Sequence, residues 1–218
     1  MTTIDQSKPV MVTGATGYVA GWLVKQLLEA GLTVHVAVRN PSKTEKIAHL
    51  EQIAAASKGS IKYFKADLLE DGSYAEAMEG CELVYHTASP FTSNFEDAQK
   101  DLVDPAVLGT KNVLEQANKT NSVKRVVLTS SCASIYTDAS EVKDTPKGML
   151  TEDIWNTTAS LEYQPYSYSK TMAERAAWEI NEKQSRWDLV VINPCLVMGP
   201  PLNPKATTSE SFNLLKQL

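Results

Sequence analysis

Strand-like apolar runs alternate with helix-length segments along almost the whole chain, and this alternation restricts the fold more than any other feature. The runs are Pro9–Val12, Thr33–Val38, Ile61–Lys65, Leu83–His86, Arg125–Thr129 and Leu189–Ile192. Helical patterns separate them at Val19–Ala30, Ser42–Ala56, Tyr74–Met78, Asp97–Asn118 and Tyr166–Gln184, with an offset expected at Pro105. Six strands separated by helices predict an α/β fold, in which a doubly wound parallel sheet is flanked by helices on both faces.

The chain has 218 residues and no linker, repeat or low-complexity stretch, so we expect a single domain over residues 1–218. The formal net charge of −5 gives no reason to expect nucleic-acid binding. No apolar run approaches the ~20 residues of a membrane-spanning helix, and the polar start MTTIDQSK does not resemble a secretory signal. Three cysteines without a CxxC pair indicate reduced thiols in a cytoplasmic protein, and three scattered histidines do not predict a metal site.

The first expected strand runs directly into a glycine-rich turn, VTGATGYVAGW, which precedes an expected helix. Gly14 and Gly17 are followed by Ala20 in a Gly-x-x-Gly-x-x-Ala pattern. Glycines at such a junction permit a tight turn and let backbone N–H groups approach a pyrophosphate, whose charge the helix N-terminus favours. The pattern favours a dinucleotide site, and the alternative is a glycine turn that closes an ordinary α/β unit.

Two cations follow the second expected strand, at the place where an NAD-binding protein carries an acidic residue. Arg39 ends the stretch VHVAVR, and Lys46 stands in the next helical segment. Cations here can neutralise a 2′-phosphate, which favours NADP (NADPH) over NAD; the alternative is that either one is a solvated surface charge. Asp67, just after the third strand, is placed to accept from an adenine amino group or to cap the next helix.

Tyr166 and Lys170 stand four residues apart in YQPYSYSK, inside an expected helix. Residues at this spacing share one face of the helix, whereas Tyr168 points away from Lys170. Ser130 and Ser131 follow the fifth strand, at the edge of the sheet where ligands bind. A tyrosine beside a lysine can act as a general acid, because the ammonium lowers the phenol pKa from its usual ~10.

Together these features resemble the extended short-chain dehydrogenase/reductase family of the NAD-dependent epimerase/dehydratase superfamily. The dihydroflavonol reductase and cinnamoyl-CoA reductase-like branch is the most similar part of it. The resemblance spans nearly the whole chain and rests on TGATGYVAGWLVKQLLEAG, VAVRNP, KADL, VYHTASP, VVLTSS, YSYSK and INPCLVMGP. It implies a Rossmann-type fold and an NADPH-dependent oxidoreductase that reduces an aldehyde or ketone, a small-molecule carbonyl substrate.

The resemblance also implies roles for individual residues. Ser131 would orient the carbonyl, Tyr166 would protonate the nascent alkoxide, and Lys170 would bind the nicotinamide ribose while lowering the tyrosine's pKa. The implied cofactor contacts are Gly14, Thr16, Gly17, Tyr18, Val19, Arg39, Lys46, Asp67, Leu68, Thr87, Ala88, Ser89, Ser130, Tyr166, Lys170, Pro194 and Val197. Asn112 is interpreted as structural support for a neighbouring strand end, and Cys195 as a small packing residue.

The chain departs from the family at its end, because members continue well beyond the point at which this sequence stops. We therefore expect a C-terminal substrate lobe that is missing or truncated, with residues 139–164 and 199–218 contributing to the substrate pocket. A homodimer through the helices at Asp97–Asn118 and Tyr166–Gln184 is the family expectation.

Two other functions remain as alternatives. A sugar-nucleotide epimerase or dehydratase shares the Ser/Tyr/Lys set, but Arg39 opposes NAD, and Cys132 stands where a dehydratase tends to carry an acidic residue. A non-catalytic NADP-binding sensor is opposed by the intact Tyr166 and Lys170 pair, whereas the missing substrate lobe favours it.

Overall fold

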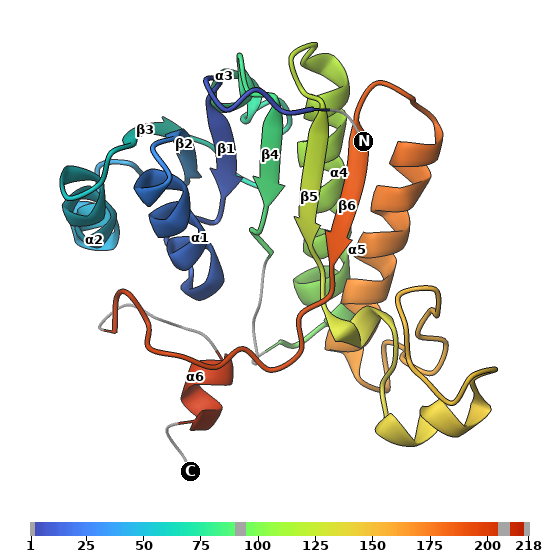
Figure 1. The fold of residues 1–218 in the computed structure, drawn as a ribbon. Coiled ribbons are helices and arrows are strands. Elements are labelled where there is room, and N and C mark those ends of the chain that lie inside the picture. Colours follow the sequence, from blue (N-terminus) through green and yellow to red (C-terminus); the bar gives the residue numbers. More distant parts are fainter. Residues whose placement is uncertain (1–2, 90–94, 205–209, 216–218) are drawn as a thin grey trace.

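The computed structural model describes residues 3–89, 95–204 and 210–215, and its centre is a six-stranded parallel sheet (Figure 1). The strands are β1 (Val10–Thr13), β2 (Thr33–Val38), β3 (Ser60–Lys65), β4 (Leu83–His86), β5 (Arg125–Thr129) and β6 (Asp188–Ile192). They lie in the order β3-β2-β1-β4-β5-β6, and every neighbouring pair is parallel. The chain winds outward from β1 on one side and then from β4 on the other, which confirms the doubly wound sheet.

Helices cover both faces of the sheet (Figure 1). They are α1 (Tyr18–Glu29), α2 (Thr44–Ala55), α3 (Ala75–Met78), α4 (Asp104–Lys119), α5 (Pro165–Glu182) and α6 (Glu210–Leu215). Three short helical turns complete the set: a π-helix, η1 (Gln99–Val103), and two 3-10 turns, η2 (Cys132–Ser134) and η3 (Ala139–Asp144). Residues of α1 and α2 pack on one face of the sheet, and residues of α3, α4 and α5 pack on the other.

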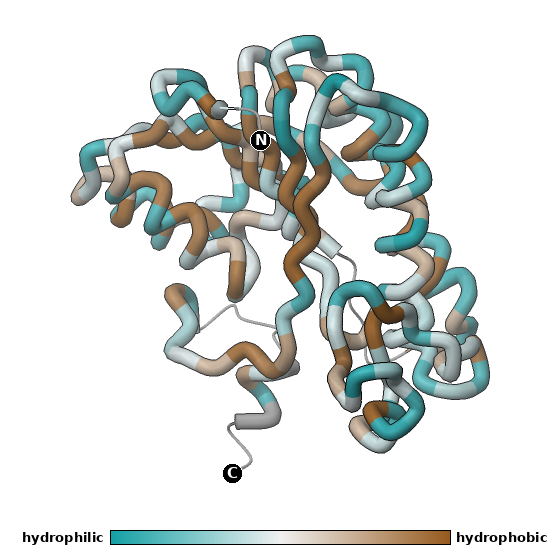
Figure 2. The backbone as a smooth tube through the Cα atoms, turned by 45° about the vertical axis from the view of Figure 1, so that its right-hand side comes forward, coloured by the Kyte–Doolittle hydropathy of each residue, from teal (hydrophilic) through white to brown (hydrophobic). Residues whose placement is uncertain are grey.

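The core consists of two apolar layers, one on each side of the sheet. Along β1, Val10 and Val12 contribute to the layer beneath α1, whereas Met11 between them belongs to the layer beneath α3 and α4. Because side chains alternate between the faces of a strand, strands buried on both faces are apolar at nearly every position. Figure 2 shows this as brown strands in the middle of the molecule. None of the described helices is both long and apolar enough to cross a membrane.

The expected strands and helices are confirmed with small shifts in their bounds. Three strands, β2, β4 and β5, have the predicted limits, and the other elements differ by one or two residues at an end, except at the start of α4. The largest difference is at the helix expected from Asp97, where the π-helical turn η1 comes first, α4 begins only at Asp104, and Pro105 lies in the first turn of α4. Proline has no N–H and its ring crowds the carbonyl four residues earlier, so a regular helix cannot run through this point.

Candidate active site

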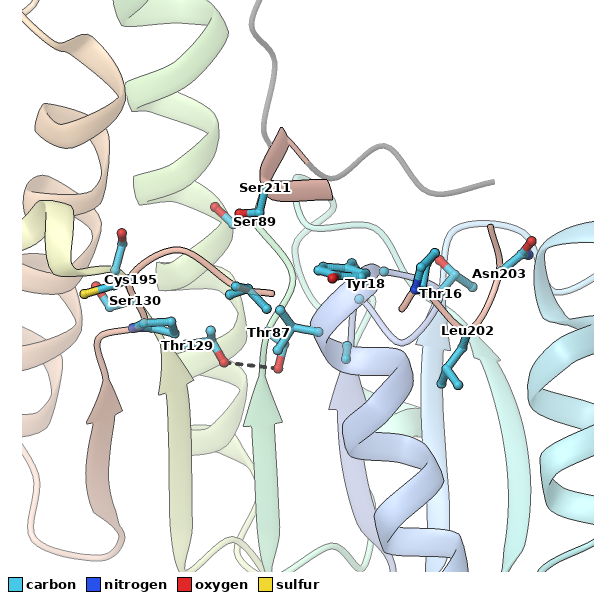
Figure 3. A pocket seen from close by; sticks show the side chains of 18 of the residues that line it. Thr16, Tyr18, Thr87, Ser89, Thr129, Ser130, Cys195, Leu202, Asn203 and Ser211 are labelled. Carbon is cyan, nitrogen blue, oxygen red and sulfur yellow. Dashed lines mark hydrogen bonds between the residues drawn. The ribbon is translucent and has the colours of Figure 1, made fainter. Parts of the chain in front are cut away.

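A cleft of about 330 Å³ opens beyond the carboxyl ends of the strands, where the order of the sheet reverses between β1 and β4 (Figure 3). Its walls come from the β1–α1 turn, the segments that follow β4, β5 and β6, the start of α5, and part of α6. The lining residues are Gly14, Thr16, Gly17, Tyr18, Val19, Ala20, His49, Thr87, Ser89, Thr129, Ser130, Ser131, Tyr166, Lys170, Pro194, Cys195, Val197, Pro201, Leu202, Asn203 and Ser211. Ligands of open parallel sheets bind at this switch point.

The β1–α1 turn requires glycine because neighbouring backbone passes very close to it. Gly14 has a φ of +70°, and a Cβ there would lie 2.9 Å from the backbone N and Cα of Ala88. The N–H of Gly17 donates to the carbonyl of Gly14 at 2.8 Å, and a Cβ on Gly17 would stand 3.0 Å from that oxygen. Helix α1 then begins at Tyr18 without a side-chain cap, so its first N–H groups are available to an anion. The turn therefore offers backbone N–H groups to an anion such as a pyrophosphate.

A buried hydroxyl joins the end of β4 to the end of β1. Thr13 Oγ1 accepts hydrogen bonds from the N–H groups of Thr87 and Ala88 at 3.1 and 3.0 Å. Its own proton therefore points to Nδ1 of His86, 2.9 Å away, which places the ring's N–H on Nε2. Burial, and secondarily the charge of Lys170, lower the pKa of His86 to about 3, so the ring is neutral. These bonds hold the segment after β4 beside the glycine turn.

Replacing Thr13 by valine is expected to lower the free energy of unfolding by about 2–3 kcal/mol. The change keeps the side-chain shape but leaves a buried ring nitrogen and two half-buried N–H groups without the partner that they have now. Urea titration followed by circular dichroism measures the change. The matched control is Thr33→Val, whose hydroxyl bonds to Ser60 Oγ at an exposed site, and it should cost no more than about 0.5 kcal/mol. A Thr13→Val chain as stable as wild type would contradict this account.

Helix α5 brings Tyr166 and Lys170 to the wall of the cleft, one turn apart. Pro165 occupies the first turn of the helix, as its sequence position predicts. Lys170 Nζ lies 5.8 Å from the centroid of the Tyr166 ring and donates to Ser89 Oγ at 3.0 Å. Burial lowers the pKa of Lys170 to about 8, and the charge of Glu174 acts in the opposite direction.

The phenol pKa of Tyr166 differs from the expectation drawn from the sequence. Burial raises this pKa, and a hydrogen bond with Ser131 lowers it less than burial raises it. The expectation that Lys170 brings the phenol pKa of Tyr166 below its usual value is wrong for the protein without a bound cofactor. The loss of hydration dominates, and the Lys170 ammonium is directed to Ser89.

The two serines after β5 point in opposite directions, as an extended backbone dictates. Ser131 is hydrogen-bonded to Tyr166, and its Oγ accepts from the N–H of Ala133 at 3.2 Å. Ser130 also borders the cleft, but its hydroxyl donates to the carboxylate of Glu174. The structure thus brings the three residues that the sequence proposes as catalytic into one wall of the cleft.

Arg39 and Lys46 lie outside the lining of the cleft, at the carboxyl edge of the sheet. Arg39 follows β2 directly and is exposed, and Lys46 is exposed in the first turn of α2. Arg39 is close enough to Tyr74 for its charge to oppose the rise that burial causes in that phenol's pKa. Within the described parts of the chain, the side chains of Arg39 and Lys46 make no hydrogen bond or ion pair, so both charges are open to solvent and to an anion.

The segment after β3 is held away from the lining of the cleft. Asp67 accepts a hydrogen bond from the N–H of Leu69 at 3.0 Å. Its expected role as a cap of the next helix is wrong, because α3 begins several residues later.

Leu68 packs on α4, where a Cβ on Gly109 would stand 3.1 Å from the Leu68 side chain. Asn112 Nδ2 donates to the carbonyl of Leu68 at 3.0 Å, which confirms that this asparagine supports a neighbouring strand end. Ala88, by contrast, packs directly on the glycine turn.

The segment after β6 folds back across α1 and completes the cleft (Figure 3). The Tyr18 hydroxyl donates to the carbonyl of Gly199, and Asn203 Nδ2 lies 3.4 Å from Nδ1 of His49. Neither His49 nor Asn203 belongs to a motif of the sequence. These pairs are 181 and 154 residues apart in the sequence, and no local pattern connects them before the fold is known.

The long segment 139–164 lies near the N-terminal end of α5 (Figure 1). Its Trp155 packs against Arg175 of α5, with the guanidinium 4.8 Å from the ring centroid, and its Tyr163 hydroxyl donates to Asp138 at 2.8 Å. None of the described residues in this segment lines the cleft. Its expected part in a substrate pocket stays a prediction.

Comparison with known proteins extends the family resemblance. The model of the NAD dependent epimerase/dehydratase family matches residues 10–216. The chain is 42% identical over 214 residues to cinnamoyl-CoA reductase CAD2 of Medicago truncatula, covering 97% of this chain and 64% of that protein. It is 41% identical over 220 residues to tetraketide alpha-pyrone reductase 1 of Arabidopsis thaliana, covering 98% of this chain and 65% of that protein. The chain thus spans slightly less than two thirds of the length of these relatives.

A solved structure shows the same architecture. The yeast methylglyoxal/isovaleraldehyde reductase Gre2, complexed with NADPH, matches with a TM-score of 0.74 and 32% identity, covering 88% of this chain and 59% of that one. The sheet order, the glycine turn and the match to the family model agree with one another. The chain belongs to the NAD-dependent epimerase/dehydratase family.

Proposed function

We propose that this chain is the dinucleotide-binding and catalytic part of an NADPH-dependent oxidoreductase that reduces an aldehyde or ketone. The observation that carries the proposal is the composition of the cleft, where a glycine cradle and the Ser131, Tyr166 and Lys170 side chains meet. Similarity to plant reductases and to an NADPH-bound yeast reductase supports the same reading.

The residues present fit a dinucleotide phosphate. Gly14 and Gly17 permit the tight turn at the start of α1, because a Cβ at either position would meet backbone atoms at 2.9 or 3.0 Å, and both glycines line the cleft in which a pyrophosphate would lie. Arg39 supplies an exposed cation after β2, where a 2′-phosphate would lie. NADPH, when bound, would supply the hydride for reduction.

The hydroxyls of Ser131 and Tyr166 are hydrogen-bonded to each other and face the cleft, so a carbonyl oxygen can bind to both. As the carbonyl carbon accepts a hydride, its oxygen gains negative charge and takes the phenol proton of Tyr166, which leaves an alcohol and a phenolate. The ammonium of Lys170, with a pKa of about 8 and its position held by Ser89, stabilises that phenolate. Loss of this ammonium at alkaline pH should therefore reduce activity.

The proposal includes two properties that depend on the whole molecule. Two copies would pair through α4 and α5, and the 55% exposure of Leu108 on α4 supports an apolar contact there. A monomeric mass in light scattering would remove the dimer from the proposal. A cytoplasmic location is also part of the proposal, and the absence of a disulfide among the three cysteines supports it.

The test of the function is the consumption of NADPH, measured at 340 nm with a panel of aromatic and aliphatic aldehydes and ketones, with NADH in parallel. Turnover that depends on both NADPH and a carbonyl compound supports the reductase. Tight binding of NADPH without turnover of any carbonyl would favour the sensor alternative. Turnover of a nucleotide sugar with NAD would favour the epimerase or dehydratase.

A further inference from the structure

Helix α5 contains a buried carboxylate that the proposed reaction does not use. Glu174 stands one turn beyond Lys170, on the face of α5 that also carries Tyr166, and it is 5% exposed. Burying a carboxylate costs several kcal/mol unless hydrogen bonds replace its hydration. Glu174 does not line the cleft, so contact with a ligand does not explain its place.

Three polar groups from outside α5 converge on one oxygen of this carboxylate. Ser130, directly after β5, donates its hydroxyl proton to Oε2, and Nδ2 of Asn193, directly after β6, lies 2.8 Å from the same oxygen. The hydroxyl of Ser134, at the end of η2, lies 2.6 Å from this oxygen and 2.7 Å from the carbonyl of Ser131, and its one proton is shared between them. Asn193 also donates to the carbonyl of Ser131 at 3.2 Å. The carboxylate therefore connects α5 to the segment after β5, which contains Ser131, and to the segment after β6.

We propose that Glu174 is the positioning residue of this site. Its carboxylate holds the segments after β5 and β6 against α5, so that Ser131 meets Tyr166, and its negative charge stands one helical turn from the Lys170 ammonium. The catalytic consequence of this arrangement rests on the proposed function, whereas the arrangement itself does not.

The charge of Glu174 bears on the protonation of Lys170. Burial lowers the pKa of Lys170 to about 8, and Glu174 opposes that fall. The other groups around this ammonium are the Tyr166 ring on the same helix, the Ser89 hydroxyl, and neutral His86 at the end of β4. Without the charge of Glu174, burial acts unopposed, so the pKa of Lys170 falls further and the ammonium is lost at lower pH.

The titration of Lys170 in the full chain tests this, followed by NMR of ¹³C-labelled lysine and assigned by the signal lost in Lys170→Met. In Glu174→Gln the pKa of Lys170 is expected to fall by about 1 pH unit, the lower end of what a neighbouring opposite charge produces. Glu179→Gln is the matched control, because it removes an exposed carboxylate from the same helix, and Lys170 should titrate there as in wild type. Equal titrations in wild type and Glu174→Gln would overturn the proposal.

Kinetics separate this inference from the proposed function. In carbonyl reduction, Glu174→Gln is expected to lower kcat about tenfold or more, through misplacement of Ser131. The alkaline limb of its pH profile should move to lower pH, while the Kd for NADPH stays within about twofold of wild type. If wild type reduces no carbonyl compound but the Lys170 titration shifts in Glu174→Gln, the proposed function fails and the positioning role stands.

If Glu174→Gln does not fold, Ser134→Ala still tests whether the Glu174 carboxylate holds the turn η2 against α5. Ser134→Ala removes one hydroxyl next to the carboxylate and no charge. In η2 the N–H of Ile135 donates to the carbonyl of Cys132 at 2.9 Å, so hydrogen exchange over residues 131–136 reports how firmly the turn is held. Exchange is expected to become about tenfold faster in Ser134→Ala. Exchange equal to wild type would show that the Glu174 network does not hold the turn.

Discussion

Replacing Tyr166 by phenylalanine is expected to lower kcat for carbonyl reduction by about 10³-fold, within the range for loss of a general acid. The variant keeps the ring that lies beside Lys170 and loses only the hydroxyl that meets Ser131. The site then lacks the proton that the alkoxide needs. Binding of NADPH does not use this hydroxyl for its phosphates, so its Kd should change by less than about threefold. Stopped-flow kinetics and fluorescence titration measure the two quantities.

The matched control for this variant lies two residues further along the same helix. Tyr168 borders a different pocket, on the side of α5 away from the cleft, so Tyr168→Phe should retain kcat within about twofold. The two variants make the same chemical change in one helix and differ only in the face that carries it. If Tyr166→Phe reduces carbonyls at the wild-type rate, Tyr166 is not the acid and the proposed mechanism is wrong.

The elements of the fold were predictable because each is encoded locally. Four of the six residues of β2 are β-branched, and the turn after β1 carries glycines where the backbone leaves no room for a Cβ. Tyr166 and Lys170 were predictable as a pair because helical spacing alone puts them on one face. These inferences needed no knowledge of which segments meet in space.

The remaining features of the site depend on contacts between distant segments. Thr13 is an ordinary strand residue until β4 lies beside β1 and brings His86 within 2.9 Å. Glu174 reads as a surface charge of a helix until the segments after β5 and β6 arrive with their donors. The expectation that the phenol pKa of Tyr166 is lowered was wrong for the same reason. The burial that raises this pKa is a property of the assembled cleft.

The second large effect is expected at Arg39. In Arg39→Ala the Kd for NADPH should rise about 30-fold, which corresponds to about 2 kcal/mol for a charge-assisted hydrogen bond to phosphate. The Kd for NADH should change by less than about twofold, because the two coenzymes differ only in the 2′-phosphate. Quenching of protein fluorescence gives both values in one type of experiment. If the loss of Arg39 weakens the binding of NADPH and not that of NADH, Arg39 contacts the 2′-phosphate.

The control for Arg39 must remove the same charge from a place that a dinucleotide does not reach. Lys58 is exposed just before β3, at the amino ends of the strands and away from the cleft. Lys58→Ala therefore shows the effect of the change in net charge alone. Equal losses of NADPH and NADH affinity in Arg39→Ala would place the contact on the part that the coenzymes share, and unchanged affinity would mark a solvated charge. Because salt screens an exposed contact with phosphate, the difference in Kd between wild type and Arg39→Ala should also narrow as ionic strength rises.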